Sequence, residues 1–251
     1  YGMRAFRYCK HDCGHAIAAV SYAASALGWR SRLLATPSDA EIAALLGLDR
    51  DAASAERETP DCLLWISTSE SLPSGMPSAP SRWHGQANRL STDHVEWPEI
   101  EQAHWLTAKP CLDHEPVNRV SVAHETAGKP ACDLSAAQII RQRRSAVAFD
   151  GTTSIGADAF FAMLDATLPR LGAPPWCAWP WTAEAHLAIF VHRVDALDSG
   201  LYVLVRNPDA LAPLKATLQP DWLWHKVGPP GLPLYLLVAH DLRYTARLVC
   251  C

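Results

Sequence analysis

Three arginines and a serine, Arg141, Arg143, Arg144 and Ser145, stand close together at the end of a predicted helix. Guanidinium groups bind oxyanions through paired N–H donors, and a serine hydroxyl supplies a further donor. The cluster therefore suits a phosphate group. A second interpretation stays open, because arginines at the C-terminal end of a helix also interact favourably with the helix dipole and need no ligand for that.

Cysteine and histidine alternate between Cys9 and His15, which raises the question of a metal site. Zinc sites usually combine one closely spaced pair of cysteines with a second pair downstream. Here the later cysteines are scattered singly. We therefore expect no metal, and interpret Cys13 and His15 as the entry to a helix. No secretory leader is visible, so the cysteines are expected to be reduced thiols of a cytoplasmic protein.

The composition is that of an ordinary globular chain, with 251 residues, 49% hydrophobic, 19% charged and a net charge of −4. This length suits one large domain or two modest ones. The charge indicates neither a nucleic-acid nor a membrane partner, and the longest apolar run, 232–239, is too short to span a bilayer. Because the chain starts at Tyr1 and ends within an apolar helical pattern, we expect it to be an internal fragment.

Helical and strand patterns are mixed without strict alternation, which predicts the α+β class. Capping residues, stop glycines and helical spacing predict helices over 14–27, 38–47, 98–107, 135–144 and 156–168. Short apolar runs predict a buried strand over 62–67 and further strands over 186–193, 200–205 and 233–239. The composition of residues 68–82 predicts a loop, and the irregular stretch 109–133, with its prolines, indicates a domain boundary.

Three segments carry a family resemblance. Residues 7–16 and the alanine-rich stretch that ends at Trp29 look like an Arg-Tyr…Gly-His segment followed by a long central helix. Residues 143–150 look like an Arg-x-Ser-x-Arg/Lys-x-Phe motif in which Val147 replaces the second basic residue. Residues 191–202 look like a strand–turn–strand. Together these segments resemble the nitroreductase-like superfamily, and within it the SagB-type dehydrogenases.

The order of the segments is inverted relative to that family. The first belongs to the later half of such a domain, whereas the other two belong to its earlier half. The resemblance therefore implies a tandem protein of two nitroreductase-like domains. Residues 1–82 would be the C-terminal part of the first, 83–133 a connector, and 134–251 the N-terminal part of the second, each with the mixed sheet and flanking helices of that fold.

The resemblance implies FMN as the cofactor. Arg143 and Ser145 would hold its phosphate and ribityl side, and Arg144 would be either a surface residue or an alternative phosphate contact. A basic residue in place of Val147 would stabilise the anionic reduced flavin, which valine cannot do. The loop Ala35–Ser38 would lie near the flavin ring. The tryptophan-rich loop 174–181 would either cover an aromatic ligand or close the core, and we favour the core.

Two functions follow from the resemblance. One is an FMN-dependent oxidoreductase acting on a small molecule or a peptide, with azoline oxidation as one candidate reaction. The other is a degenerate, non-catalytic scaffold or peptide-binding protein, which the replacement by Val147 favours. In either case the resemblance implies a pseudo-dimer of the tandem domains or a homodimer. Within the connector, Asn88 and Arg89 could pack on the partner domain or contact a ligand.

Overall fold

The structure is a computed structural model that describes residues 2–51, 57–69, 71, 73, 75–85, 93, 95–116 and 133–250. It contains both helices and strands, so the predicted α+β class is confirmed. Within these ranges, no helix is both long and apolar enough to cross a membrane. The connector residues Asn88 and Arg89 lie outside the described residues.

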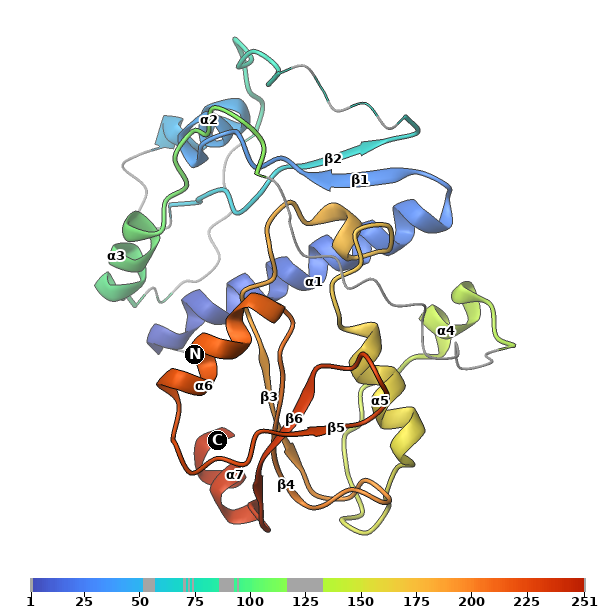
Figure 1. Ribbon diagram of the computed structural model, residues 1–251. Coiled ribbons are helices and arrows are strands. Elements are labelled where there is room, and N and C mark those ends of the chain that lie inside the picture. Colours follow the sequence, from blue (N-terminus) through green and yellow to red (C-terminus); the bar gives the residue numbers. More distant parts are fainter. Residues whose placement is uncertain are drawn as a thin grey trace. The chain divides into compact units, whose positions relative to one another are not determined.

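The chain divides into two compact units (Figure 1). The first unit comprises Tyr1–Asn118 with Leu171–Trp181, and the second comprises Arg119–Arg170 with Thr182–Cys251. The described connector residues 95–116 therefore pack with the first unit, as does a segment from much later in the chain. That the two units are partial copies of one fold stays a prediction.

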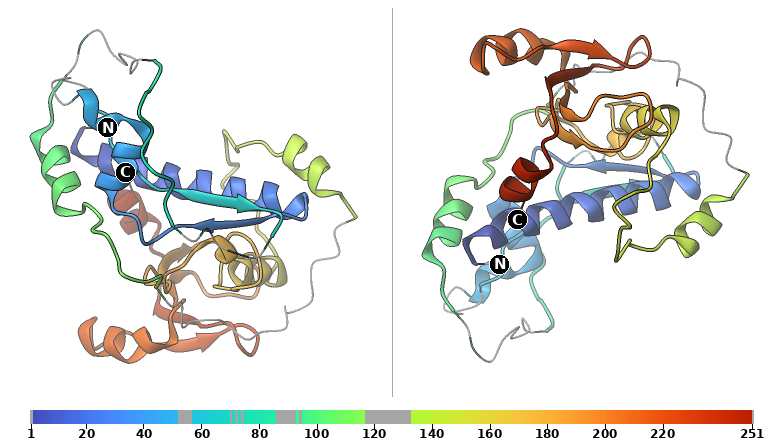
Figure 2. Two further views of the ribbon diagram at one scale, coloured as in Figure 1. Left: turned by 90° about the horizontal axis from the view of Figure 1, so that it is seen from above. Right: turned by 90° about the horizontal axis from the view of Figure 1, so that it is seen from below.

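The first unit is built on the long helix α1 (Ala5–Ala26), which packs against the antiparallel strands β1 (Arg30–Leu33) and β2 (Leu64–Ser67) (Figure 2). Its small core contains Ile17, Leu33 and Ala178. The half-buried side chains of Cys13, Cys62, Leu64, Trp179 and Trp181 pack around this core. Ala178 belongs to a short 3-10 helix, Trp176–Ala178, that contacts β1.

Helix α1 begins well before the predicted start at residue 14. Asp12, which the sequence would allow as a cap before residue 14, lies inside the helix. The N-cap position is Arg4, without a side-chain cap bond. The residues before Gly14 are mostly compatible with a helix, and one interior glycine costs only about 1 kcal/mol, which the packing of α1 on β1 offsets. The helix ends as predicted, with Gly28 in the left-handed region at a φ of 73°.

The remaining elements of the first unit are short. Helix α2 (Asp39–Leu46) has the predicted capping box between Ser38 and Glu41 and the predicted stop at Gly47, and a 3-10 turn, Leu48–Asp51, follows. Helix α3 (Pro98–Leu106) begins at the predicted proline. The prediction of a buried strand over 62–67 is partly wrong, because Trp65 and Ile66 are exposed. Their apolar side chains, which suggest a core strand in the sequence, lie at the surface of the first unit.

The second unit holds a four-stranded antiparallel sheet in the order β3–β4–β6–β5. Its strands are β3 (Leu187–Val191), β4 (Gly200–Leu204), β5 (His225–Val227) and β6 (Leu234–Ala239). Its helices are α4 (Ala136–Gln142), α5 (Ala157–Ala166), α6 (Leu211–Thr217) and α7 (Arg243–Cys250).

Helices α5 and α6 cover opposite faces of this sheet (Figure 1). Tyr202 and Leu204 of β4 point toward Phe160 and Leu164 of α5. Their neighbour Val203 points the other way, where α6 contributes Leu211 and Leu214 to a second cluster. The alternating side chains of β4 thus explain why this strand is apolar throughout.

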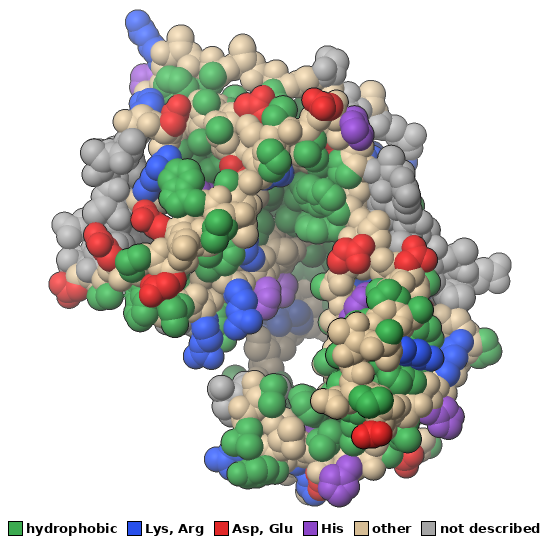
Figure 3. Space-filling view, turned by 60° about the vertical axis from the view of Figure 1, so that its left-hand side comes forward, with side chains coloured by type: hydrophobic (Ala, Val, Ile, Leu, Met, Phe, Trp, Pro, Cys, Tyr) green, Lys and Arg blue, Asp and Glu red, His purple; other side chains and the backbone are tan. Residues whose placement is uncertain are grey.

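The face in Figure 3 shows apolar side chains interspersed with charged groups of both signs.

Candidate functional site

The predicted phosphate-binding residues lie at the C-terminal end of α4. A second capping box, between Ser135 and Gln138, starts this helix, and Arg143 is its C-cap residue. The chain then runs extended, and the Nη1 atom of Arg143 donates to the Oγ atom of Ser145 over 3.5 Å. Both side chains are exposed. The structure therefore brings the two predicted anchors together on an open surface.

Unlike Arg143, Arg144 donates its hydrogen bonds to backbone oxygens at the end of α4. Its Nη1 atom donates to the backbone oxygens of Arg141 at 2.9 Å and Arg143 at 2.8 Å. The Nε atom of Arg141 in turn donates to the backbone oxygen of Ala137 at 3.2 Å. Basic side chains commonly satisfy the last carbonyls of a helix in this way. The helix-end interpretation thus accounts for Arg141 and Arg144, whereas the side chain of Arg143 points to Ser145.

The segment after Ser145 presents apolar side chains to solvent. Val147 is 98% exposed and Phe149 is 84% exposed. At the far end of the segment, the carboxylate of Asp150 accepts hydrogen bonds from the backbone N–H groups of Thr152 and Thr153, both at 2.8 Å. The hydrogen bonds from Thr153 and Thr152 lower the pKa of Asp150. The segment is therefore bounded by local hydrogen bonds at its two ends and is exposed along its length.

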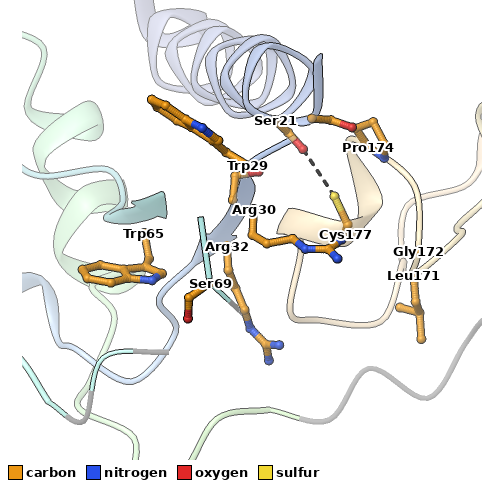
Figure 4. A pocket seen from close by; sticks show the side chains of 12 residues that line it. Ser21, Trp29, Arg30, Arg32, Trp65, Ser69, Leu171, Gly172, Pro174 and Cys177 are labelled. Carbon is orange, nitrogen blue, oxygen red and sulfur yellow. Dashed lines mark hydrogen bonds between the residues drawn. The ribbon is translucent and has the colours of Figure 1, made fainter. Parts of the chain in front are cut away.

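A cavity of about 230 Å³ lies in the first unit, beside β1 (Figure 4). Its lining combines basic, hydroxyl and aromatic side chains with part of the 171–177 segment: Ser21, Ser25, Trp29, Arg30, Ser31, Arg32, Trp65, Ser69, Leu171, Gly172, Pro174 and Cys177. Arg30 extends toward Cys177, whereas the indole rings of Trp29 and Trp65 lie on the other side of β1 (Figure 4). No aspartate or glutamate is among the described residues that line it.

Two buried polar atoms at this cavity have no hydrogen-bond partner among the described residues. They are the Oγ atom of Ser31, whose residue is 6% exposed, and the Nε atom of Arg32. Arg32 also lines a neighbouring cavity of about 360 Å³, together with Glu115 and Trp179. The Oε2 atom of Glu115 is likewise buried without a partner. Such unsatisfied groups are uncommon in folded proteins, and a bound ligand or water is one explanation for them.

The connector covers the loop that the resemblance places near a flavin ring. The backbone oxygen of Thr36 accepts a hydrogen bond from the N–H of Leu112 at 2.9 Å. The Nζ atom of Lys109 donates to the backbone oxygens of Leu34 at 3.5 Å and Ala35 at 3.3 Å. Burial lowers the pKa of Lys109, although the charges of Asp39 and Glu115 act in the opposite direction. The loop 35–38 is thus occupied by contacts within the first unit.

The cysteines and histidines near the N-terminus lie on α1. Among the described residues, no three side chains of the types that hold metals come together. Cys13 is instead close to Cys62, with 3.8 Å between the two Sγ atoms. In the tryptophan-rich loop, Trp179 and Trp181 meet edge to face, with ring centroids 5.0 Å apart, and pack on the core. Trp179 also lines the larger cavity. The packing favours the core interpretation, and the cover of an aromatic ligand stays a prediction.

Comparison with known proteins adds no assignment. The chain matches no protein-family model, no curated protein and no solved structure. The resemblance to the nitroreductase-like superfamily therefore stays a prediction.

Sequence reasoning missed the cavity beside β1. The signal that could have indicated it is the run Trp29-Arg30-Ser31-Arg32, directly after the glycine that stops α1. Such a run suits a polar site more than a core strand. The segment 171–177 that closes the cavity is far away in sequence, and no local pattern predicts that it packs there.

Proposed function

We propose that this protein is an FMN-dependent oxidoreductase of the nitroreductase-like, SagB-type dehydrogenase kind. The observation that carries the proposal is the convergence of Arg143 and Ser145 on one exposed spot, over a distance of 3.5 Å. A guanidinium and a hydroxyl that meet in this way supply several donors to one phosphate group. FMN would supply the two-electron redox chemistry, and the chain would supply its anchoring.

The exposed apolar segment supports a site that a second surface completes. Val147 and Phe149 are almost fully exposed, although apolar side chains of this size gain about 1.5–3 kcal/mol each on burial. A partner surface that covers them would lie directly beside Arg143 and Ser145. This placement fits a cofactor bound between two domains, in a pseudo-dimer of tandem domains or in a homodimer.

A second candidate function is a non-catalytic scaffold or peptide-binding protein of the same fold. The loop 35–38 is covered by Lys109, Leu112 and Glu115, which leaves it few backbone groups for a flavin ring. Val147 adds no positive charge near a reduced flavin. These two observations favour a protein that has lost flavin chemistry in at least one of its sites.

A titration of the full chain with FMN separates the two candidates. Arg143→Ala removes a charge-assisted contact and should weaken FMN binding about ten- to a hundred-fold. The matched control is Arg141→Ala, which removes the same charge two residues earlier. Because the Nε atom of Arg141 is bonded to the backbone of Ala137, this variant should bind FMN within about threefold of the wild type.

The readout is the quenching of flavin fluorescence on binding. Equal losses in the two variants would mean that only the general positive field matters, and not the Arg143–Ser145 pair. Unchanged affinity in Arg143→Ala would remove this residue from any cofactor site. Failure of the wild-type protein to bind FMN, combined with saturable binding of a peptide, would favour the scaffold.

A further inference from the structure

We propose that the cavity beside β1 binds a small organic anion, in which a carboxylate or phosphate group is attached to a ring or another apolar group. The inference concerns the first unit and does not depend on flavin binding, because Arg143 and Ser145 belong to the second unit. It rests on the charge of the cavity, on its unsatisfied donors and on its size.

The charge of the lining is positive. Arg30 and Arg32 stand two positions apart on β1, so their Cβ atoms project on the same side of the strand. Among the described residues, no carboxylate lines the cavity. The C-terminal end of α1 lies close by at Ser25, and its dipole is equivalent to about half a negative elementary charge. The charge of the Arg32 guanidinium alone exceeds this, so the cavity favours an anion.

The donors of the cavity are in place before any ligand arrives. The Oγ atom of Ser31 is buried and has no hydrogen-bond partner among the described residues, and the same holds for the Nε atom of Arg32. A buried donor without a partner loses its hydration and gains nothing in return. Ser31 lies between the two arginines on β1, so its side chain projects from the opposite side of the strand. An oxyanion bound on the side of Arg30 and Arg32 satisfies the Nε atom of Arg32. A guanidinium fork also matches the geometry of carboxylate and phosphate oxygens.

The apolar residues that line the cavity determine which uncharged group the ligand can carry beside its acidic group. The indole rings of Trp29 and Trp65 lie across β1 from the side chain of Arg30 (Figure 4), so the apolar part of a ligand held by the arginines packs on the later segment instead. Leu171 and Pro174 line the cavity from the later segment. At about 230 Å³ the cavity is smaller than the roughly 300–1,000 Å³ that house drug-sized ligands. A single ring that carries one acidic group, such as benzoate or phenyl phosphate, matches this combination.

The neighbouring cavity is a weaker candidate for an anion. It shares Arg32, but Glu115 lines it as well, and a carboxylate repels an anionic ligand. Glu115 is already engaged through its Oε1 atom, which accepts from the backbone N–H and the hydroxyl of Thr36 at 3.4 and 3.3 Å. The anion is therefore assigned to the smaller cavity, on the side of Arg30 and Cys177.

The test is a calorimetric titration of the full chain with three probes: benzoate, phenyl phosphate and benzamide. Benzamide has nearly the shape of benzoate but no charge. We expect saturable binding of at least one of the two anions and at least about tenfold weaker binding of benzamide. The stronger of the two anions identifies whether a carboxylate or a phosphate is the preferred group. Benzamide binding as tight as that of benzoate would overturn the proposal, as would the absence of binding by both anions.

Variants locate the site. Arg32→Gln should weaken binding of the anion at least about tenfold. Arg82→Gln is the matched control, because Arg82 is exposed and lines neither cavity, and it should leave the affinity unchanged. Equal losses in Arg32→Gln and Arg82→Gln would overturn the proposal.

A further variant guards against misfolding. Arg32→Lys keeps the charge but loses the planar fork, so it should fold and bind the anion with intermediate affinity. Near-ultraviolet circular dichroism checks that each variant keeps its tertiary packing. If Arg32→Lys folds and binds benzoate and benzamide equally, the assignment of Arg32 as the anion anchor is wrong.

Discussion

At the scale of single residues, the clearest electrostatic feature is the thiol of Cys62. Burial, followed by the influence of Cys13, raises the pKa of Cys62 from its ordinary value of 9.0 to about 12. The folded state thus favours the protonated thiol. Its contribution to stability is fully present below pH 9.0 and is lost as the pH rises toward about 12.

The raised pKa predicts slow alkylation of Cys62. Only the thiolate reacts with iodoacetamide, so at pH 8 the native protein should modify Cys62 far more slowly than the exposed Cys9. Between about pH 8 and pH 10 the rate at Cys62 should rise about tenfold per pH unit, in proportion to its thiolate fraction. Peptide mass spectrometry measures both rates. Modification of Cys62 at the rate of Cys9 would contradict the burial and the pairing with Cys13.

At the scale of the elements, the start of α1 can be tested through its glycines. Gly14 lies in the helix interior, and a Cβ atom added there would meet nothing within 4 Å beyond its chain neighbours and the backbone of the helix itself. Gly14→Ala should therefore stabilise α1 by about 0.5–1 kcal/mol. Gly28 has a φ of 73°, so Gly28→Ala should destabilise it by about 1–2 kcal/mol.

Hydrogen exchange of the α1 amides measures these changes locally, so it does not require that the two units unfold together. Slower exchange in Gly14→Ala and faster exchange in Gly28→Ala are the expected results. If α1 began at residue 14, as its sequence pattern indicates, the amides of residues 9–13 would be unprotected in both the wild type and Gly14→Ala.

The two capping boxes form a matched pair. Ser38 accepts from the backbone N–H of Glu41 at 3.1 Å, and α2 then buries Ile42 completely. Ser135 makes the same contact with Gln138 at 3.3 Å, but α4 has no buried residue. Ser38→Ala should therefore lower the free energy of unfolding of the first unit by about 0.5–2 kcal/mol.

Ser135→Ala should fray α4 alone and leave the stability of both units unchanged within error. Denaturant titration monitored by tryptophan fluorescence gives the first quantity, and helical circular dichroism gives the second. Equal destabilisation by the two substitutions would mean that α4 packs on a surface that its exposure does not reveal.

The same elements show why part of the fold could be predicted from the sequence. Helices α2, α3 and α4 begin at local signals, namely the capping residues Ser38 and Ser135 and the proline Pro98, and all three starts are confirmed. The sequence does not predict strands β1 and β5, because Arg-Ser-Arg-Leu and His-Lys-Val carry no strand pattern. They become strands by pairing with β2 and β6, and such pairing depends on residues outside the strand itself.

The two candidate sites also differ in whether a local sequence signal predicts them. The pairing of Arg143 with Ser145 is a contact between residues two positions apart, so the motif itself indicates it. The cavity beside β1 forms because Cys177 and Pro174 pack close to Ser21 and Arg32, which are far away in sequence. That juxtaposition arises from tertiary packing, and no spacing within either segment encodes it.

At the scale of the whole molecule, each of the two units leaves apolar side chains exposed that a partner could cover. The first unit has a thin core, and β2 leaves Trp65 and Ile66 exposed. The second unit has a sheet covered on both faces, but its leading segment exposes Val147 and Phe149. Exposed apolar groups at such places are typical of surfaces that a further domain or subunit covers. This is the physical basis for expecting a pseudo-dimer or homodimer.

The visible absorption spectrum of the purified protein, followed by identification of any flavin released on denaturation, tests the central claim most directly. The account predicts a yellow protein that releases FMN, or a colourless one that turns yellow and binds FMN saturably when the cofactor is supplied. A protein that is colourless as purified and takes up no FMN would contradict the proposed oxidoreductase.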